Sequence, residues 1–209
     1  MKINVLGLGP GNRDYILPEV EKRIKSSDLI VGGKRNIESI PDLTSGKEIA
    51  YIDRHLKELV QSMKDNMSEK KIAVVLSGDT GFYSMLGYLR KNFELSQLDV
   101  VPGISSMQYF FAKIGEQWHD AVIKSVHGRE FDYIEALKSA GKVGLLTDNI
   151  NTPQEIAKKI WESGIEATVY VGENLSYPDE CITSGKASEI KSIQKKFDLN
   201  VVIIKGEEL

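Results

Sequence analysis

Several residue types that mark particular protein classes are scarce in this chain of 209 residues. It has a single cysteine, Cys181, and therefore cannot form an internal disulfide. Its three histidines are scattered, and no group of histidines and cysteines has the spacing of metal ligands. We therefore expect neither a disulfide framework nor a bound metal.

Long apolar runs and an excess of basic residues are also missing. No stretch approaches the ~20 apolar residues of a membrane-spanning helix, and the first residues lack the apolar segment of a signal peptide. The formal net charge of −3 argues against a surface built to bind nucleic-acid phosphates. The sequence predicts a cytoplasmic protein that has neither a membrane nor a nucleic acid as its partner.

The sequence does not match either of two common nucleotide-binding motifs. The phosphate-binding motif G-x-x-x-x-G-K-[ST] does not occur. Residues 7–11 begin like the dinucleotide fingerprint, but Asn12 stands where its third glycine belongs. The acidic residue expected after the second strand is also absent, because the apolar residues 29–31 are followed by two glycines. A nicotinamide cofactor is therefore disfavoured.

What the first half does contain is three glycine-bearing loops, each after an apolar run. Residues 2–6 lead into the loop 7–11, residues 72–76 into 77–84, and residues 99–101 into 102–106. In an open α/β sheet, ligands bind outside the carboxyl ends of the strands, where glycine lets the backbone approach them. Asp79 could accept hydrogen bonds from such a ligand, or it could be an ordinary turn or helix-cap residue.

Strand-like and helix-like segments alternate along the chain, which favours a mostly parallel sheet. In the first half we expect strands near 2–7, 28–31, 72–77 and 98–101, and helices near 17–26, 55–66, 83–92 and 105–114. The pattern restarts after residue 119, with strands near 121–126, 142–147, 167–171, 180–183 and 200–205 and helices near 131–139 and 153–163. We therefore predict two α/β domains, 1–115 and 116–209, the second with a mixed sheet.

Four segments together resemble the tetrapyrrole (corrin/porphyrin) methylases in order and spacing. They are the opening glycine loop, the Ser77-Gly78-Asp79 loop, and residues 101–106 and 145–148. The resemblance covers essentially the whole chain and implies a two-domain α/β methyltransferase that uses S-adenosylmethionine. One departure is plain, because Thr80 stands where the family usually has a proline after Gly-Asp.

Three further segments, residues 31–35, 125–129 and 172–180, look most like the branch of the family that methylates carbon 5 of (cobalt-)precorrin-7 in cobalamin biosynthesis. The resemblance thus implies that activity. Two alternatives stay open. One is a sibling methylase that acts on another precorrin position or on a non-tetrapyrrole acceptor such as RNA or a protein residue. The other is a non-catalytic module that binds a corrinoid or a nucleotide.

The resemblance also implies a donor site in which the second domain closes over the cofactor. The implied residues of the first domain are Pro10, Gly78, Asp79, Phe82, Ser105 and Ser106, and those of the second are Leu146, Thr147, Gly172, Glu173, Asn174 and Leu175. Without the family, the two serines would be ordinary turn residues and Leu146 a core residue. No catalytic base is identified, because the sulfonium of the donor already activates its methyl group.

The implied acceptor carries several acetate and propionate arms, so an acidic chain needs local cations to bind it. Arginine suits carboxylates because its planar guanidinium can donate two parallel hydrogen bonds. Arg35 and Arg129 are the arginines that we place in glycine-bearing loops, and together with His127 they are the predicted substrate contacts. The alternative is a surface arginine that caps a helix or pairs with Glu130.

The partners expected from the resemblance are the small-molecule tetrapyrrole and a second copy of the chain. Five apolar residues, Phe82, Tyr83, Met85, Leu86 and Tyr88, crowd one short segment more densely than a single helix face can bury. Some relatives carry a fused domain for methylation and decarboxylation at carbon 15. We expect a separate protein to perform that step here.

Overall fold

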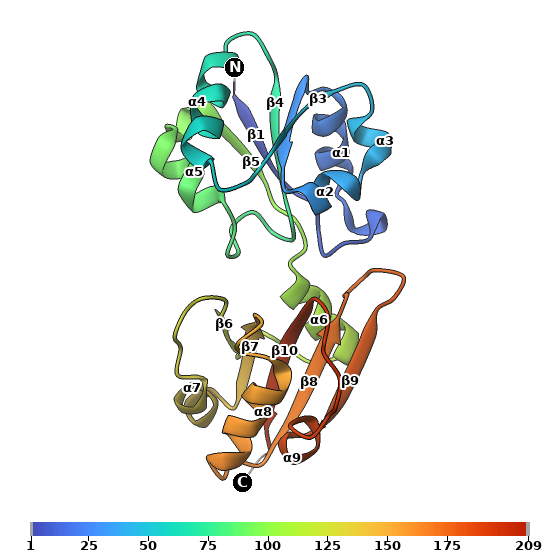
Figure 1. Ribbon diagram of the computed structural model, residues 1–209, viewed down its shortest axis with the longest axis vertical. Coiled ribbons are helices and arrows are strands. Elements are labelled where there is room, and N and C mark those ends of the chain that lie inside the picture. Colours follow the sequence, from blue (N-terminus) through green and yellow to red (C-terminus); the bar gives the residue numbers. More distant parts are fainter. Residues whose placement is uncertain (1, 208–209) are drawn as a thin grey trace. The chain divides into compact units, whose positions relative to one another are not determined.

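The computed structural model describes residues 2–207 and divides into two compact units. The first unit ends at Ser105 and the second begins at Ser106. Each unit contains a five-stranded sheet with helices packed on it (Figure 1). The prediction of a two-part α/β fold, with a parallel first sheet and a mixed second sheet, is confirmed.

The first sheet has five parallel strands in the order β3-β2-β4-β1-β5. Its central strands are continuous apolar runs because helices bury both faces of the sheet, and all five residues of β4 are buried. The strands are β1 (Ile3–Gly7), β2 (Leu29–Gly32), β3 (Glu48–Tyr51), β4 (Ile72–Leu76) and β5 (Leu98–Val101).

Helices cover both faces of this first sheet (Figure 1). On one face lie α1 (Pro18–Lys25), α2 (Lys34–Glu38) and α3 (Pro41–Thr44), and on the other α4 (Leu56–Asn66) and α5 (Leu86–Asn92). Short 3₁₀ turns, η1 (Arg13–Tyr15) and η2 (Leu95–Gln97), complete the unit. Because every strand is parallel, the loops that follow β1, β4 and β5 all leave the same edge of the sheet.

The second sheet has the order β6-β7-β10-β8-β9 and is mixed. Its strands β6 and β7 are parallel, whereas β10 is antiparallel to both β7 and β8. The strands are β6 (Val122–Ser125), β7 (Lys142–Leu146), β8 (Ala167–Glu173), β9 (Cys181–Lys186) and β10 (Asn200–Gly206). One face is covered by α7 (Tyr133–Ala140), α8 (Pro153–Glu162) and α9 (Ala187–Ile190), which share one apolar core with the strands.

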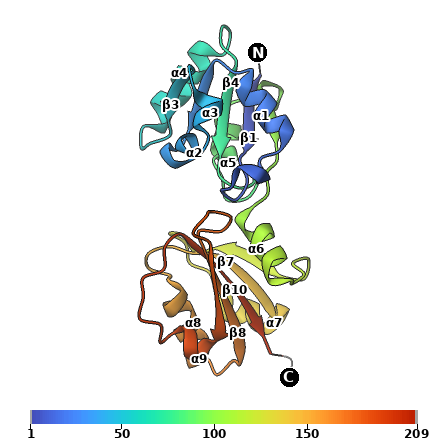
Figure 2. The ribbon, with the colours of Figure 1, turned by 90° about the vertical axis from the view of Figure 1, so that its right-hand side faces the viewer.

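Helix α6 (Ser106–Ile114) packs on the opposite face of the second sheet (Figure 2). A Cβ atom on Gly144 of β7 would lie 2.8 Å from Sδ of Met107, and one on Gly172 of β8 would lie 3.0 Å from Cε2 of Phe110. The division between the units therefore falls before this helix, whereas we predicted it after residue 115. The apolar spacing predicted the helix itself but could not indicate which sheet it would cover.

Several short helices and strands were not predicted from the sequence. Strand β3 is an edge strand whose residues are exposed or half-buried, so its sequence has no apolar alternation to detect. Helices α2 and α3 have five and four residues, too few to establish a helical period. The helix predicted for 83–92 begins at Leu86, because the residues before it form a turn. Between residues 2 and 207, no helix is long and apolar enough to cross a membrane.

Candidate functional site

The loops after β1, β4 and β5 meet at three glycines in the first unit. A Cβ atom on Gly103 would lie 2.3 Å from the carbonyl oxygen of Gly78, and one on Gly7 would lie 2.6 Å from the nitrogen of Gly103. Gly78 has a φ of 67°, which residues with side chains rarely adopt. Only residues without a Cβ atom let these backbones approach so closely, and the structure thus brings together the three loops that the sequence singled out.

A short bridge joins the first loop to the second. Gly9 and Gly78 exchange backbone hydrogen bonds of 3.2 and 2.8 Å, and the N–H of Leu8 donates to the carbonyl of Leu76 at 2.8 Å. Pro10 follows directly and is buried. The glycine loop of β1 is therefore held as an extension of the sheet, and it lacks the helix start that a dinucleotide fingerprint would require.

Asp79 connects the second loop to the third. Its Oδ1 accepts the N–H of Gly81 at 2.8 Å, and its Oδ2 accepts the N–H of Gly103 at 3.1 Å. The first bond closes an Asx turn, in which a side chain mimics a backbone acceptor. Asp79 thus has the turn role that the sequence left open, and its bond to Gly103, which the sequence did not predict, also fixes the spacing of two loops.

The turn that follows Asp79 is ordered by its own backbone. Thr80 is buried, and its carbonyl accepts a hydrogen bond from the Ser84 hydroxyl just before α5. Tyr83 has a φ of 48°, in the left-handed region that residues with a Cβ rarely occupy. The rings of Phe82 and Tyr83 meet edge to face with centroids 4.9 Å apart. The departure from the family's proline at Thr80 therefore leaves an ordered turn.

The third loop ends at the boundary between the two units. Ser105 is buried and is the last residue of the first unit, whereas Ser106 is half-buried and begins α6 of the second. These adjacent serines, both predicted donor contacts, belong to separate units.

In the second unit, Asp148 organises the loops that follow β6 and β7. Its Oδ2 accepts the N–H of Gly128 at 2.8 Å, and its Oδ1 accepts the N–H groups of Ile150 and Asn151 at 2.9 and 2.6 Å. The bonds from Asn151 and Gly128 are the main reason that the pKa of Asp148 falls to about 2. The carboxylate is therefore charged throughout the neutral range.

The predicted contacts His127 and Thr147 lie beside this carboxylate. Nδ1 of His127 lies 3.3 Å from the carbonyl oxygen of Thr147, while the Thr147 hydroxyl donates to the carbonyl oxygen of Asn200 at 2.7 Å. Leu146, the last residue of β7, is half-buried. His127 and Arg129 are exposed at the end of β6, and the N–H of Arg129 donates to the carbonyl of Val126 at 3.4 Å.

These loops border a groove on the second unit with a volume of about 1170 Å³. His127, Thr147 and Asp148 line one part of it, and the start of α8 and residues 193–200 line the rest. Lys195 and Lys196 supply its positive charge, and Asp148 and Asp198 supply negative charge. Charges of both signs therefore face the same groove.

Glu173, Asn174 and Leu175 lie where β8 turns toward β9. Glu173 is buried, and its carboxylate accepts hydrogen bonds from the Lys195 ammonium and, at 3.1 Å, from the N–H of Asp198. Leu175 is buried and lies over Gly172, where a Cβ atom would be 2.7 Å from its Cδ2. The predicted donor contact Glu173 therefore also holds residues 195–198 in place.

Glu180 lies at the other end of this turn, at the end of the segment 172–180, and the sequence predicted no role for it. Its Oε2 accepts the Tyr109 hydroxyl and the Ser176 N–H, each at 2.6 Å, and its Oε1 lies 3.0 Å from the Lys113 ammonium. Burial by itself would raise the pKa of Glu180, but these bonds, led by that of Tyr109, hold it below its ordinary value. No spacing rule links Glu180 to a residue on α6, so the sequence could not indicate the contact.

The placement of Arg35 differs from the prediction. It is exposed on helix α2 and does not lie in a loop. The two glycines before it end strand β2 and cap the helix, since β2 stops at Gly32 and Gly33 is the N-cap residue. At Gly32 a Cβ atom would lie 2.5 Å from Cγ2 of Val75, so close packing explains that glycine without a ligand.

Comparison with known proteins adds an independent observation. The family model that describes the sequences of the tetrapyrrole (corrin/porphyrin) methylases matches residues 2–191 of this chain. The chain belongs to this family. Tetrapyrrole methylases transfer methyl groups from S-adenosylmethionine, and the chain is therefore a methyltransferase, as the resemblance of its glycine loops implied.

Two relatives among the tetrapyrrole methylases match over nearly the full chain. One, from Methanocaldococcus jannaschii, is named a probable cobalt-precorrin-7 C(5)-methyltransferase; it is 32% identical, and the match covers 99% of each chain. The other, from Salmonella typhimurium, is named a cobalt-precorrin-7 C(5)-methyltransferase; it is 30% identical, and the match covers 98% of this chain and 99% of the relative.

A solved structure confirms the tetrapyrrole methylase fold. The uroporphyrin-III C-methyltransferase from Thermus thermophilus superposes with a TM-score of 0.76 at 17% identity, over 98% of this chain and 97% of its own. That enzyme was crystallised in complex with S-adenosylhomocysteine.

The lowered pKa of Asp148 predicts acid-sensitive stability. The carboxylate favours folding above its ordinary pKa of 3.8, and this stabilisation is lost as the pH falls toward the folded value of about 2. Asp148→Asn should therefore lower the free energy of unfolding at pH 7 by ~1 kcal/mol, a modest figure because the side chain is partly exposed. Between pH 4 and 2, the variant should lose less stability than the wild type.

Urea unfolding of both proteins at pH 7, 4 and 2.5 measures this difference. Asp132→Asn is a suitable control, because its carboxylate caps α7 in the same unit by accepting the N–H of Glu135 at 3.0 Å. Parallel pH profiles for the wild type and Asp148→Asn would contradict the assignment.

Proposed function

We propose that this chain transfers the methyl group of S-adenosylmethionine to carbon 5 of cobalt-precorrin-7 in cobalamin biosynthesis. The observation that carries the proposal is the identity of 30–32%, over 98–99% of the chain, with two relatives named for that reaction. A match of this length includes the donor loops as well as the segments 125–129 and 172–180. The cytoplasmic location predicted from the sequence belongs to the same proposal.

The three loops of the first unit suit the sulfur-bearing part of the donor. At Gly7, Gly78 and Gly103 the backbones of three strand-end loops pack directly on one another, which holds the loops in a fixed arrangement at the carboxyl ends of the strands, where ligands bind in open α/β sheets. We propose that Pro10, Gly78, Phe82, Ser105 and Ser106 contact the donor here, and that Asp79 supports them by fixing the loop spacing. In the second unit, Leu146, Thr147 and the turn that starts at Gly172 would contact the adenine.

The reaction requires little chemistry from the protein. When the donor is bound, its sulfonium would supply an electrophilic methyl group. The sulfur–methyl bond breaks as a carbon–carbon bond forms at the acceptor, S-adenosylhomocysteine leaves, and the acceptor loses one proton to solvent. The chain must hold the acceptor carbon in line with the methyl group and exclude water. Loops whose spacing is fixed by close glycine contacts and carboxylate–backbone bonds suit this positioning.

The acceptor's carboxylate arms require hydrogen-bond donors and positive charge; we propose that Arg129 supplies the charge and that His127 recognises a carboxylate beside it. Both are exposed and lie two residues apart in the loop after β6. Arg35 is also exposed, on α2 of the first unit, and we keep it as a third candidate. The methylation and decarboxylation at carbon 15 would be the work of a separate protein.

A product assay tests the reaction and separates it from its alternatives. Purified protein incubated with S-adenosylmethionine and a mixture of cobalt-precorrin intermediates should add 14 mass units, one methylene equivalent, to cobalt-precorrin-7 alone; mass spectrometry with fragmentation locates the methyl group. A gain on another intermediate would indicate a sibling methylase. Binding of donor and corrinoid without any mass gain would indicate a non-catalytic module.

If Arg129 binds a carboxylate arm of the acceptor, replacing it should weaken the binding of the acceptor but not that of the donor. Arg129→Ala should raise the KM for the acceptor about tenfold, given ~1.5–3 kcal/mol for a charged hydrogen bond, and Arg129→Lys should recover only part of it. The KM for S-adenosylmethionine should remain unchanged. Lys138→Ala, which removes an exposed cation from α7 of the same unit, is the control. If Arg129→Ala raises the KM values for donor and acceptor equally, Arg129 is not a contact of the acceptor.

We also propose that the chain forms a homodimer through the segment 82–88. In the structure Met85, Leu86 and Tyr88 pack partly against the core of the first unit, while 41% of Tyr83 is exposed. Light scattering at micromolar concentration should therefore give a mass near twice 23.3 kDa, and Tyr83→Glu should shift it toward the monomer. A monomeric wild type would contradict the proposal.

A further inference from the structure

The turn between β8 and β9 has an unusual backbone conformation. Asn174 and Ser176 have φ values of 44° and 68°, in the left-handed region that residues with a Cβ seldom occupy. Two such residues within three positions persist only where surrounding contacts impose them, and they gather at ligand-binding segments. The turn is also where the proposed function places the donor's adenine.

Leu175, between these two residues, has backbone groups available for a ligand. Only 5% of the residue is exposed, yet neither its N–H nor its carbonyl has a hydrogen-bond partner among residues 2–207. Buried backbone groups are nearly always paired, so this pair suits a ligand that both accepts and donates along one edge. An adenine ring has such an edge, and the apolar Leu175 side chain suits its faces.

The Glu180 carboxylate bonds one end of the turn to helix α6. It accepts the N–H of Ser176 and the hydroxyl of Tyr109, and it lies 3.0 Å from the Lys113 ammonium. Tyr109 and Lys113 both belong to α6, and only 8% of Tyr109 is exposed. One carboxylate therefore ties the strained end of the turn to a helix packed on the same sheet.

Three further hydrogen bonds hold the start of the turn, around Asn174. The amide of Asn174 donates to Asp179 at 2.7 Å, and the N–H of Tyr177 donates to the carbonyl of Asn174 at 2.9 Å. Both join residues within the turn. The N–H of Asn174 donates to Leu199 at 2.8 Å and fixes the point where the turn leaves β8. Glu180 thus connects Ser176, at the far end of the turn, to α6.

We propose that Glu180 is a positioning residue for the donor: it holds residues 174–176 so that the Leu175 backbone can bind the adenine. This inference rests on the proposed function, because it takes the adenine-bearing donor as the ligand. It adds a residue and a mechanism that the sequence did not indicate. Glu180 itself contacts the protein only.

Calorimetric titration of the full chain with S-adenosylhomocysteine and with methylthioadenosine tests the inference. Both molecules carry adenine, and only the first carries the amino-acid end. Glu180→Gln keeps one hydrogen-bond acceptor oxygen and replaces the other with a donor. It should lower the affinity for both molecules about tenfold. Tyr109→Phe, which removes one hydrogen bond without changing the charge, should weaken both about threefold.

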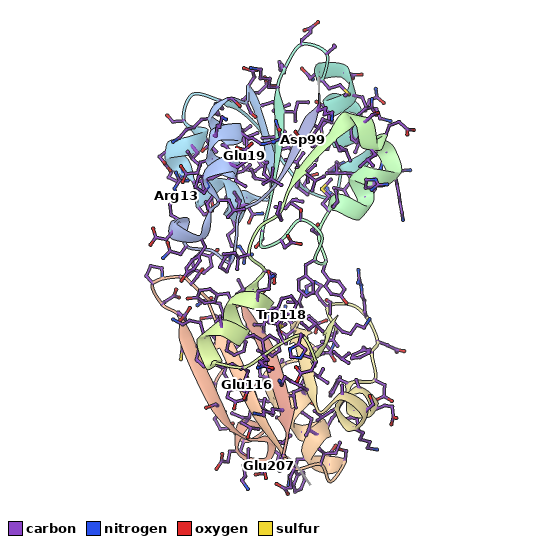
Figure 3. The ribbon with its side chains drawn as sticks, turned by 180° about the vertical axis from the view of Figure 1, so that it is seen from behind. Arg13, Glu19, Asp99, Glu116, Trp118 and Glu207 are labelled. Carbon is purple, nitrogen blue, oxygen red and sulfur yellow. The ribbon has the colours of Figure 1, made fainter. Side chains whose placement is uncertain are left out.

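Glu116→Gln provides the matched control. Glu116 follows α6 in the second unit (labelled in Figure 3), and its carboxylate pairs with Lys205 at 2.5 Å and Lys142 at 3.5 Å. Its side chain is 21% exposed, close to the 17% of Glu180. This variant should bind both molecules within about twofold of the wild type, even if its Tm falls as far as that of Glu180→Gln.

The outcomes separate the inference from the proposed function. If the wild type binds S-adenosylhomocysteine and folded Glu180→Gln and Tyr109→Phe bind it equally well, Glu180 has no positioning role and the proposed function stands. If affinity follows Tm alone, with Glu116→Gln losing as much, the role is merely structural and the inference is overturned. If the wild type binds neither molecule, the donor assignment and this inference both fail.

Discussion

The close contact of Gly7, Gly78 and Gly103 is the constraint on which the first unit depends. Strands β4, β1 and β5 are neighbours in a parallel sheet, so their carboxyl ends open onto one edge, and the loops must cross there. A Cβ atom at Gly103 would come within 2.3 Å of the Gly78 carbonyl, a distance that no side chain permits. The sheet order and the missing side chains together create an edge where the backbones of three loops pack directly on one another.

Carboxylates bond loop backbone in both units. Asp79 bonds Gly103, Asp148 bonds Gly128, Glu173 bonds Asp198 and Glu180 bonds Ser176, each through a backbone N–H. A charged acceptor forms stronger hydrogen bonds than a neutral one, and each acid here joins segments that are separated in the sequence or are strained. Such supports suit a reaction in which the donor provides the reactive group and the protein provides its position.

The sequence predicted the parts of the fold that repeat or that carry a local signal. Alternating apolar runs indicated the parallel sheet, and glycines after three of those runs indicated the strand-end loops. The sequence did not predict contacts between residues that are far apart in the chain. The face that α6 covers, the pairing of Glu180 with Tyr109 and the loop spacing set by Asp79 all depend on contacts made only in the folded chain. Arg35 was misplaced because a glycine pair marks a helix cap as readily as a binding loop.

Donor and acceptor recognition differ in how tightly the fold constrains them. The donor candidates lie mainly in backbone that is pinned by missing side chains, by an Asx turn and by left-handed residues, so few substitutions are tolerated there. The acceptor candidates His127 and Arg129 are exposed side chains on one loop, and replacing them disturbs no core. A scaffold built this way can retain one methyl donor while its acceptor changes. On the proposed assignment, the methylated position would depend on a few exposed residues rather than on the fold, in keeping with one architecture that carries enzymes named for different reactions.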